Sequence, residues 1–600
     1  MYERTGKLIR EKFREYLLPT IMTSMAVSMA SVVDGAIVGN LLGDTALAAV
    51  GLAGPIIFCI NLIYMLFGVG GLTCASIARG KREMNQANLI FTLTIGVGMA
   101  IMLLFSFVMQ FVIPPLSLSL AGGDTSLASM LESYLRPLVF TGPALMFSSG
   151  MALFIRTDGQ PKSSAVVVII ANVVNLVFDY VLIRFFNVGI WGAGFSTTLG
   201  YICGAAIVLP YLHSKKRSFR FVRPGRESLR TLANILGTGL PKGLIQIANI
   251  LRSLALNSII ISFLGSIGMS VMTVCINVQM ISNIFVGGVS DALLPIVGTL
   301  FGERDSYGIR QTMKSALAVL AASCAVLTAF LLIAPQLMGM AFGISSAQGI
   351  AAVKPALRLF ALYLPFDAAI QLLQNFYTTT GRKRMASAMV IMNGLIFVLP
   401  FAFLLAHAAP DFFWLCYACS GAATLLATAT ACMRIQKKEQ VHSILLLKEH
   451  HDDDVRYDVT IKATAQQAAG LSEHILKWCM EQGLDARIAN RVGVAIEEMA
   501  VSTAHYAHHD SGKGVIDVAL RLTNGTLEIR LRDNGEIFNP VEYASDENDG
   551  CITDGIQLIR QLADGVDYAR QLGFNTTVIT FSLLRQSGIP VRQVKKSLLC

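Results

Sequence analysis

The chain has 600 residues, of which 54% are hydrophobic and only 14% are charged, and its mean hydropathy is +0.58. Soluble domains carry roughly 25% charged residues, so a water-soluble protein of this composition could not cover its surface. The composition therefore excludes an ordinary soluble enzyme and indicates a protein that lies mostly in a membrane. On such a protein the net charge of +9 reflects topology, and no nucleic-acid partner is expected.

The charge is divided unevenly between two parts of the chain. Residues 1–440 hold 32 Lys and Arg against 17 Asp and Glu, a net charge of +15, whereas residues 441–600 hold 16 against 22, a net charge of −6. We therefore expect a basic membrane region followed by an acidic domain, with the boundary near 435–455. The opposite charges also suggest that the acidic domain docks on the basic loop at 213–235.

Apolar runs long enough to span a bilayer, about 20 residues, occur twelve times. They lie near 16–40, 50–77, 88–113, 132–155, 163–184, 190–212, 236–262, 270–300, 314–337, 355–377, 385–407 and 411–433. The pattern predicts an all-α polytopic membrane protein with twelve transmembrane helices. We expect helices 1–6 to form an N-lobe (1–212) and helices 7–12 a C-lobe (236–435), joined by the 213–235 loop.

Basic residues alternate from one loop to the next. With the N-terminus in the cytoplasm, the inner loops hold most of the Lys and Arg, whereas the outer loops at 41–49, 263–269 and 408–411 hold none. The positive-inside rule then places both termini in the cytoplasm. We expect a multi-pass protein of the bacterial cell membrane.

An internal repeat relates the two halves. At one constant offset, the one that separates Pro19 from Pro241, the sequence matches pairs of prolines, glycines and arginines without a gap from Pro19 to Gly159. The pairs include Pro19 with Pro241, Gly43 with Gly265, Gly80 with Gly302, Arg82 with Arg304, and Gly159 with Gly381. Because six helices return the chain to its starting side, both bundles have the same orientation. This predicts two parallel six-helix bundles, an arrangement found in transporters with a substrate site between or within the halves.

Ionisable residues inside apolar runs are costly, and so they are candidates for function. Asp34 lies in the first predicted helix and Asp179 in the fifth, where Asn172, Asn175 and Asp179 share one helix face through spacings of 3 and 4. A carboxylate beside amide oxygens can hold a proton or bind a sodium ion, so Asp34 and Asp179 are candidate Na⁺ ligands. The alternative is a hydrogen bond that only packs helices together, or a residue near a helix end whose side chain reaches the membrane surface.

The C-lobe carries its own ionisable residues. Asp291 and Asp367 lie in the eighth and tenth predicted helices, and Arg252 lies in the middle of the seventh. For these three the functional and the packing interpretations are equally weighted.

These residues lie in segments that resemble the MATE family of multidrug and cation antiporters. The segments are VVDGAIVGNLLGDTALAAVGLAGPI (32–56), FIRTDGQPKSSAVVVIIANVVNLVFDYVLI (154–183), GIWGAGFSTTLG (189–200), LPKGLIQIANIL (240–251) and LLPIVGTLFGERD (293–305). The resemblance implies that Asp34, Asn175, Asp179 and Thr197 line an N-lobe cavity that couples H⁺ or Na⁺ to export. The seventh-helix carboxylate of some members is absent, and Asn249 and Asn257 are the nearest polar groups.

The remainder of the chain reads as a linker at 436–454, a globular domain at 455–587 and a tail at 588–600. The domain shows strands and amphipathic helices, which predict an α+β fold in which helices and a sheet form an α/β sandwich. Asn524-Gly525 indicates the turn of a β-hairpin. His450 and His451 with the Asp run at 452–454 could hold a metal ion, although this segment is typical of a solvated linker. His505 and His509 lie one helical turn apart and are a second metal-binding candidate, although exposed helix histidines also explain that pair.

This domain resembles the GHKL-type ATPases, the histidine-kinase-like fold, and specifically their anti-sigma-factor serine-kinase branch. The segments that carry the resemblance are AIEEMAVSTAHYA (495–507), DNGEIFNP (533–540) and GIQLIRQLADGVDYARQLGFNTTVITF (555–581). It implies that Asp533 accepts the adenine amino proton beside Gly535, and that ATP and Mg²⁺ bind near Glu498, Ser502 and Gly555. Two departures stand out: Ser502 replaces the magnesium-binding Asn, and the lid before Gly555 has few glycines.

From the sequence we expect a transporter rather than an enzyme: an H⁺- or Na⁺-coupled antiporter that exports organic cations or drugs by alternating access. Its partners would be the lipid bilayer, the coupling ion and the substrate. The sequence leaves open a flippase for lipid-linked or other metabolites. It also leaves open a membrane-anchored regulator whose C-terminal domain binds an anti-sigma-type partner, with or without residual ATPase or kinase activity.

Overall fold

The computed structural model describes residues 4–214, 217–342, 347–441, 445–447, 455–509, 514–523, 525–542 and 550–583. The predicted tail at 588–600, with His450 and His451 of the linker, lies outside these ranges. The chain divides into two compact units. One is a helical unit, Phe13–Leu447, and the other joins the N-terminal residues up to Lys12 to the part of the chain after Leu447.

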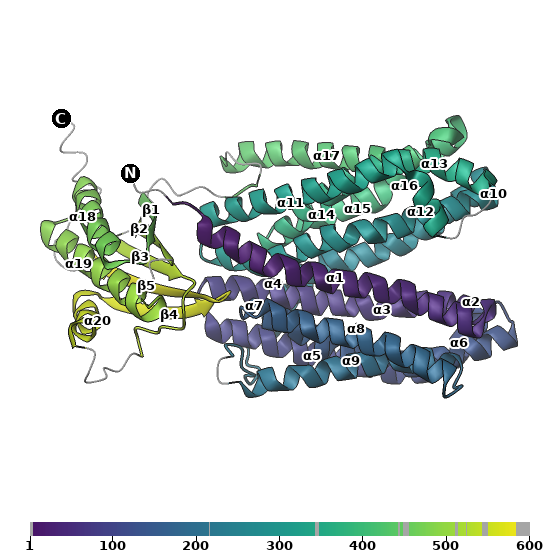
Figure 1. The fold of residues 1–600 in the computed structure, drawn as a ribbon, viewed down its shortest axis with the longest axis horizontal. Helices are drawn as coiled ribbons and strands as arrows, with labels where there is room; N and C mark the ends of the chain where they lie inside the picture. The colour runs from purple at the N-terminus through teal and green to yellow at the C-terminus, as the bar shows by residue number, and fades with distance from the viewer. Residues whose placement is uncertain are drawn as a thin grey trace. The chain divides into compact units, whose positions relative to one another are not determined.

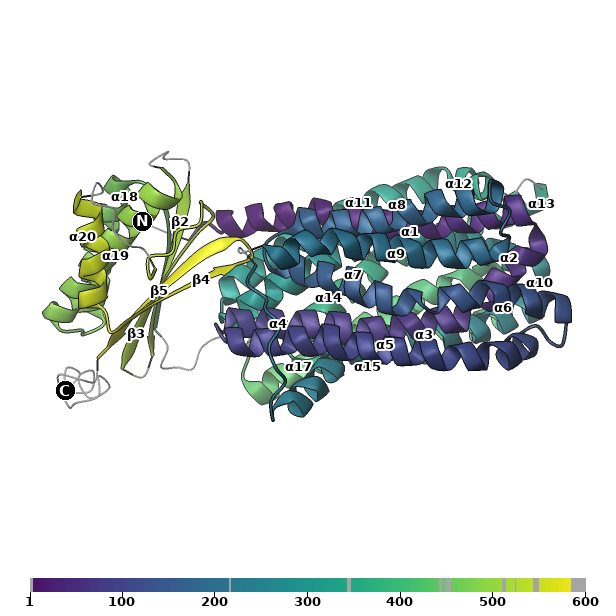
Figure 2. The ribbon, with the colours of Figure 1, turned by 90° about the horizontal axis from the view of Figure 1, so that it is seen from below.

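The helical unit consists of two bundles that lie side by side (Figures 1 and 2). The first half of the unit contains α1 (Lys7–Leu42), α2 (Asp44–Leu52), α3 (Gly54–Tyr64), a π-helical turn (Met65–Val69), α4 (Gly70–Gly80), α5 (Met84–Leu120), α6 (Thr125–Leu138), α7 (Thr141–Thr157), α8 (Pro161–Arg184) and α9 (Ile190–His213). The second half contains α10 (Ser228–Gly302), α11 (Ser306–Ile333), α12 (Pro335–Ala341), α13 (Ala347–Ala361), α14 (Leu364–Thr379), α15 (Lys383–Ile391), a π-helical turn (Met392–Ile396), α16 (Val398–Ala408), a 3₁₀ turn (Pro410–Leu415) and α17 (Cys416–Glu439).

Within the described residues, ten helices are long and apolar enough to cross a membrane, and two bent pairs bring the number to twelve. The bent pairs are Thr125–Leu138 with Thr141–Thr157, at 40°, and Gln348–Ala361 with Leu364–Thr379, at 42°. The twelve-helix prediction is thus confirmed, but its fourth and tenth helices are not continuous. Pro143 and Pro365 lie in the first turn after each bend, where a residue without an N–H costs no hydrogen bond.

Several helices extend beyond their apolar runs. The first begins at Lys7 rather than near residue 16, because the charged residues 7–15 continue the helix past the hydrophobic stretch. Hydropathy marks the part that contacts lipid, whereas backbone hydrogen bonding decides where a helix ends.

Backbone conformation confirms the internal repeat. Gly43 has φ 84° and ψ −179°, and Gly265 has φ 67° and ψ −159°. Gly43 separates α1 from α2, and Gly265 divides α10 into two membrane-length spans, Ser228–Gly265 and Ile267–Gly302. Residues with a side chain rarely adopt this conformation. Positive φ angles also recur at Arg82 (65°) with Arg304 (56°), and at Gly159 (87°) with Gly381 (80°). The halves therefore share their turns as well as their helices.

The two halves meet where α4 packs against α10. A Cβ atom on Gly80 would lie 2.1 Å from the carbonyl oxygen of Thr299, and one on Gly302 would lie 2.3 Å from that of Ile77. The internal repeat relates these two contacts, because Gly80 corresponds to Gly302 and Thr299 corresponds to Ile77. We call this contact the glycine seam, and it is the point through which the pseudo-twofold axis between the halves passes.

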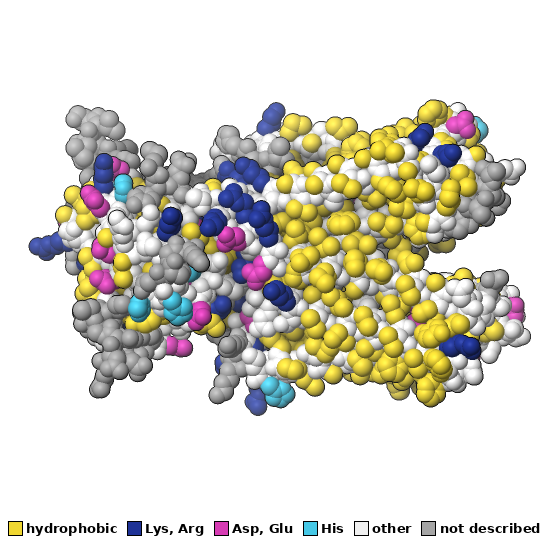
Figure 3. Space-filling view, viewed as in Figure 1, with side chains coloured by type: hydrophobic (Ala, Val, Ile, Leu, Met, Phe, Trp, Pro, Cys, Tyr) yellow, Lys and Arg dark blue, Asp and Glu magenta, His cyan; other side chains and the backbone are white. Residues whose placement is uncertain are grey.

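The outer surface of the helical unit is apolar. Large hydrophobic side chains point outward along α5, where Phe107 is 64% and Phe111 is 70% exposed. Figure 3 shows a broad hydrophobic surface over the helices and a concentration of basic side chains at one end of it. So extensive an exposed apolar surface marks a membrane contact.

The C-terminal unit is an antiparallel sheet covered on one face by three helices. Its elements are β1 (Val455–Lys462), α18 (Ala465–Glu481), α19 (Ala486–Ser502), a π-helical turn (Thr503–Ala507), β2 (Val515–Thr523), β3 (Thr526–Asp533), α20 (Gly550–Leu562), β4 (Gly565–Gln571) and β5 (Phe574–Ser582). The strand order is β1-β2-β3-β5-β4. Alternate residues of the strands, such as Val518, Ile529 and Ile579, pack against the helices in one core. The α+β sandwich is as predicted, and β2 and β3 form the predicted antiparallel pair, although Asn524 of the predicted turn lies outside the described residues.

Candidate functional site

The structure brings the two N-lobe carboxylates together. Asp34 of α1 interacts with Asp179 of α8 through their side chains. Asp179 Oδ1 also accepts a hydrogen bond from Ser196 Oγ of α9. The other oxygen of Asp179, Oδ2, and Oδ1 of Asp34 are buried, and each lacks another hydrogen-bond partner among the described residues. Two facing carboxyl groups with unused oxygens can share a proton or bind a small cation.

The neighbouring amides differ in their roles. Asn175 Nδ2 donates to Thr197 Oγ1 at 3.1 Å and approaches Ser196 Oγ at 3.5 Å. The structure therefore places Asn175, Asp179 and Thr197 in one network. Asn172 lies on the same face but donates its amide to Val168 O of its own helix at 2.8 Å, so its side chain is used in local packing.

A close approach of two helices makes this network possible. A Cβ atom on Gly200 of α9 would lie 2.3 Å from Ala171 O and 3.0 Å from Asn175 Cβ. The glycine lets α9 approach α8 until Ser196 reaches Asp179. The sequence prediction omitted Ser196, although the polar run Ser196-Thr197-Thr198 in an otherwise apolar helix was a signal that could have identified it.

Asp367 of α14 forms a separate polar centre in the second half. Its oxygens accept hydrogen bonds from Tyr363 Oη and from Gln371 Nε2, each at 2.9 Å, and Gln371 also donates to Asn283 Oδ1. Asn393 Nδ2 donates to Tyr363 Oη at 3.2 Å. The sequence prediction identified the carboxylate but missed this surrounding network, which comes from separate stretches of the chain.

Asp291 does not belong to either centre. Its Oδ1 lies 3.6 Å from Lys242 Nζ, and its side chain is 45% exposed. An ion pair of this exposure contributes little stability. Arg252 donates to Asn249 Oδ1 at 2.9 Å on its own helix. Of the C-lobe candidates, only Asp367 has the surroundings of a buried site.

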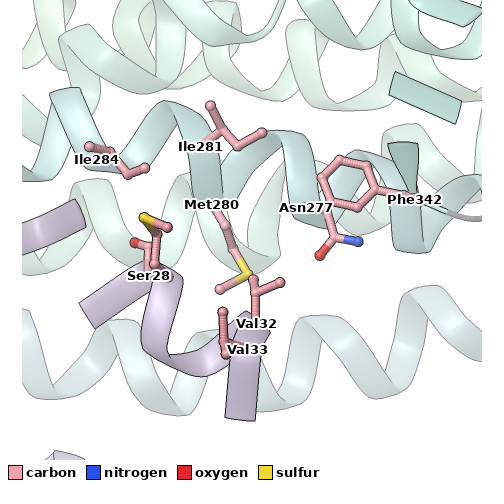
Figure 4. Close-up of a pocket in the computed structure, with 9 residues that line it drawn as sticks. Ser28, Val32, Val33, Asn277, Met280, Ile281, Ile284 and Phe342 are labelled. Carbon is pink, nitrogen blue, oxygen red and sulfur yellow. The ribbon is translucent and has the colours of Figure 1, made fainter. Parts of the chain in front are cut away.

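A cavity of about 220 Å³ lies between α1 of the first half and α10 of the second. Figure 4 shows Ser28, Val32 and Val33 facing Asn277, Met280, Ile281 and Ile284, with Phe342 at one side. Among the described residues that line the cavity, Ser28 and Asn277 are the polar ones, and none carries a carboxylate. Asp34 follows Val33 in the chain, but its carboxyl group meets Asp179 instead of lining the cavity.

The C-terminal domain brings together the residues predicted to bind nucleotide and metal. A Cβ atom on Gly555 of α20 would lie 2.2 Å from Glu498 Oε2 of α19, so the carboxylate rests directly against the glycine. Burial, with a smaller contribution from the neighbouring Glu497 carboxylate, raises the pKa of Glu498 above its usual value. Ser502 Oγ, one helical turn further on, is buried and has no partner among the described residues.

Asp533 lies at the end of β3, on the helix-covered face. Its Oδ1 accepts hydrogen bonds from Gly535 N at 2.8 Å and from Asn575 Nδ2 at 2.9 Å. Gly535 is packed against the end of the π-helical turn, because a Cβ atom there would lie 2.2 Å from Ala507 O. This close approach explains the glycine. The sequence prediction missed Asn575, which fixes the orientation of the carboxylate.

The histidine alternatives gain no support as metal sites. His505 packs its ring edge-on against Tyr506, whereas His509 lies 3.4 Å from Glu536 at the surface. The ranges given above hold no cluster of three or more His, Cys, Asp or Glu side chains arranged for a metal ion.

These features define a class of protein. In the part of the chain that the structure describes, two similarly built six-helix bundles, a carboxyl pair inside one of them and an apolar cavity between them are the features of a multi-pass membrane transporter. A helix-covered antiparallel sheet with an Asp-containing turn follows it.

Comparison with known proteins identifies both parts. The MatE family model matches residues 19–181 and 241–404, which together make up more than half of the chain, and the chain therefore belongs to the MatE family of multidrug efflux transporters. The two matches begin at Pro19 and Pro241, which are the first pair of the internal repeat. The histidine kinase-like ATPase domain model matches residues 461–582.

Relatives and solved structures resemble the membrane part. Multidrug export protein MepA of Staphylococcus saprophyticus is 20% identical over 392 residues, covering 64% of this chain and 84% of its own. Probable multidrug resistance protein YoeA of Bacillus subtilis is 25% identical over 270 residues, covering 42% and 55%.

Two structures show the same fold. An outward-facing MATE family multidrug transporter of the MOP superfamily has a TM-score of 0.67 at 20% identity, covering 72% of this chain and 97% of its own. A MOP superfamily transporter from Pyrococcus furiosus has a TM-score of 0.66 at 20% identity, covering 73% and 99%.

Proposed function

We propose that this chain is an H⁺- or Na⁺-coupled antiporter that exports organic cations or drugs by alternating access. The observation that carries the proposal is the pair formed by Asp34 and the fully buried Asp179. Two carboxylates at close range in an apolar lobe cannot both remain charged without a counterion, so the pair takes up a proton or a sodium ion. The positive-inside pattern supports a cytoplasmic position for both termini.

The neighbouring network supplies the geometry for this uptake. Ser196 donates to one oxygen of Asp179, which leaves the other oxygen to interact with Asp34 or the ion. Asn175 and Thr197 add an amide and a hydroxyl oxygen close by, and hard oxygen ligands of this kind bind sodium. Loading and release of the ion change the charge of the N-lobe, and this change would bias the two conformations of the transporter.

Dye efflux from proteoliposomes tests the coupling, with pH and sodium gradients imposed separately. We expect Asp179→Asn to abolish gradient-driven efflux. Ser196→Ala should reduce efflux about tenfold, because a hydrogen bond to a charged group contributes about 1.5–3 kcal/mol. Glu132→Gln is the matched control, since Glu132 pairs at the surface with Arg136. Wild-type efflux rates in the Asp179→Asn variant would refute the proposal.

The apolar lining of the cavity favours a second candidate, a flippase for lipid-linked or other bulky apolar metabolites. A carboxylate would be expected beside a cationic substrate, but the nine lining residues include none. Competition between a cationic dye and a lipid-linked substrate in the same vesicles separates the candidates. Transport of the lipid without transport of the dye would favour the flippase.

We further propose that the C-terminal domain is a regulatory nucleotide-binding domain. Asp533 would accept the adenine amino group, and Glu498 with the unpartnered Ser502 hydroxyl would hold Mg²⁺ beside Gly555. The buried hydroxyl without a partner supports this fit, since buried polar groups are normally satisfied. A hydroxyl is a weaker magnesium ligand than the amide expected there, so the proposal is binding rather than rapid turnover.

Calorimetry on the purified full-length protein with Mg-ATP tests nucleotide binding. We expect a binding signal that Asp533→Asn removes and that Glu473→Gln, on the exposed side of α18, leaves intact. No heat at millimolar nucleotide would refute nucleotide binding and leave a role in protein contact, such as binding an anti-sigma-type partner.

A further inference from the structure

The sheet of the C-terminal domain has a second face, which we call the open face because α18, α19 and α20 pack against the other one. The strand register places Thr460, Asp517, Arg532 and Thr576 in one row of that face. Asp517 and Arg532 are nonetheless only 4% and 3% exposed. Charged residues are almost never buried this deeply unless they are paired.

The N-terminal segment of the chain supplies a partner for this face. Arg4 Nε lies 3.5 Å from Asp517 Oδ2, and both side chains are only 5% exposed. Arg4 Nη1 lies 3.9 Å from Asp458 Oδ1. The backbone N–H of Thr5 donates to Thr460 Oγ1 at 3.0 Å, and Thr460 Oγ1 donates to Asp517 Oδ1 at 2.7 Å.

A second contact lies further along the same segment. Lys12 Nζ lies 5.0 Å from the centre of the Phe574 ring, which the Arg532 guanidinium also approaches at 5.5 Å. Arg4 and Thr5 thus contact β1 and β2, whereas Lys12 contacts β5. The segment 4–12 crosses the sheet, and its residues belong to the same compact unit as the domain.

We propose that the open face is a docking surface whose partner is the N-terminal segment of the same chain. The segment continues without a break into α1, which carries Asp34. The docked segment therefore connects the domain to the first helix of the N-lobe. Residues 448–454, the last part of the predicted linker, connect it to the chain that follows the last helix of the C-lobe.

The linker attachment is short. Arg382 Nη2 donates to Glu439 Oε2, at the end of α17, at 2.8 Å, and to Leu446 O, beyond it, at 3.1 Å. The seven residues between Leu447 and Val455 let these two residues lie at most about 29 Å apart when the chain is fully extended. Alternating access moves the two lobes relative to each other. A domain connected to the first helix of one lobe and to the last helix of the other would follow that movement. This consequence rests on the proposed transport function, whereas the docking does not.

A retention assay on the full-length protein tests the docking. A site for a specific protease is inserted into the 448–454 linker, membranes are cut and washed, and the fraction of the C-terminal fragment that stays bound is measured. We expect retention in the parent chain and a loss of roughly tenfold or more in Asp517→Arg, because one partner of a buried ion pair is then uncompensated. Combining Asp517→Arg with Arg4→Asp should restore retention.

Lys7→Glu is the matched control on the same segment, since Lys7 and its partner Glu11 are 51% and 46% exposed; it should retain the fragment. Equal retention in the parent and in Asp517→Arg, with release of both at high salt, would overturn the proposal in favour of docking on the basic 213–235 loop. Release of the parent fragment would overturn it outright.

A cross-link keeps the test independent of misfolding. With the 11 native cysteines replaced by serine, Thr5→Cys and Thr460→Cys should form a disulfide that holds the protease-cut chain together on a non-reducing gel. Absence of this product would overturn the proposal. Neither assay measures transport or nucleotide binding, so their outcome is separate from that of the proposed function.

Discussion

The glycine seam predicts that one added methyl group shifts the balance between transporter conformations. In Gly80→Ala the new Cβ would lie 2.1 Å from Thr299 O and 2.8 Å from Gly302 Cα. Both neighbours are backbone atoms, so α4 and α10 must separate by about 1 Å to reach ordinary van der Waals contact. Overpacking of this kind costs about 1–3 kcal/mol.

The cost falls only on the conformation in which the seam is closed. A penalty of about 1–3 kcal/mol on one of two states changes their ratio roughly 5- to 150-fold. Gly80→Ala should therefore favour the state in which α4 and α10 are apart. Gly96→Ala on α5 is the matched control, because a Cβ atom there meets nothing within 4 Å.

Native Cys74 provides the assay. It lies on α4 with its Sγ 3.3 Å from Thr238 Oγ1 of α10, so separation of the two helices should expose it. In a chain that keeps Cys74 alone, the rate of reaction with a small maleimide should rise with the open population. A rate that stays within about twofold of the control, in a protein that remains monodisperse, would refute the reasoning.

Three further predictions concern buried charges and close contacts. Arg79→Met should destabilise the helical unit by about 3–5 kcal/mol, because Arg79 and Asp158 form an ion pair at 3.0 Å with side chains only 1% and 2% exposed. Thermal unfolding in detergent measures this loss of stability. The loss should be much smaller in the double variant that also carries Asp158→Leu. The raised pKa of Glu498 means that it takes up a proton at a higher pH than an ordinary glutamate, near 4.3. The affinity for Mg-ATP should therefore fall as the pH is lowered, and the fall should begin above the ordinary glutamate pKa. If the Glu498→Gln variant showed the same dependence of affinity on pH as the parent, this prediction would be wrong. Gly555→Ala should abolish Mg-ATP binding by displacing the Glu498 carboxylate, whereas Gly493→Ala, whose Cβ would meet nothing closer than 3.6 Å, should bind as the parent does in calorimetry.

The sequence by itself determined the architecture of this protein. Apolar runs of bilayer length, the internal repeat that pairs Pro19 with Pro241, and the change in charge near position 440 predicted two six-helix bundles and a separate domain. These features are readable because hydrophobicity and backbone conformation are local properties. Gly43 and Gly265 could be matched by sequence, and both have the positive φ that such a position requires.

Only the tertiary structure decided which polar residues act together. Asp34 and Asp179 lie on α1 and α8, far apart in the sequence. Ser196 reaches Asp179 because Gly200 lets α9 approach α8. Asp291 resembled Asp367 in the sequence, yet one lies in a half-exposed ion pair and the other in a buried network. Contacts of this kind depend on how helices cross, which hydropathy does not encode.

The N-terminal segment shows the same limit most clearly. From the sequence, its basic residues could be interpreted only as a topology signal. A count of charges does not show which carboxylate lies near which basic residue. In the folded protein Arg4, at the start of the chain, is buried against Asp517 of the C-terminal domain. The physical reason is that burial raises the cost of an unpaired charge, so the fold alone determines which charges pair.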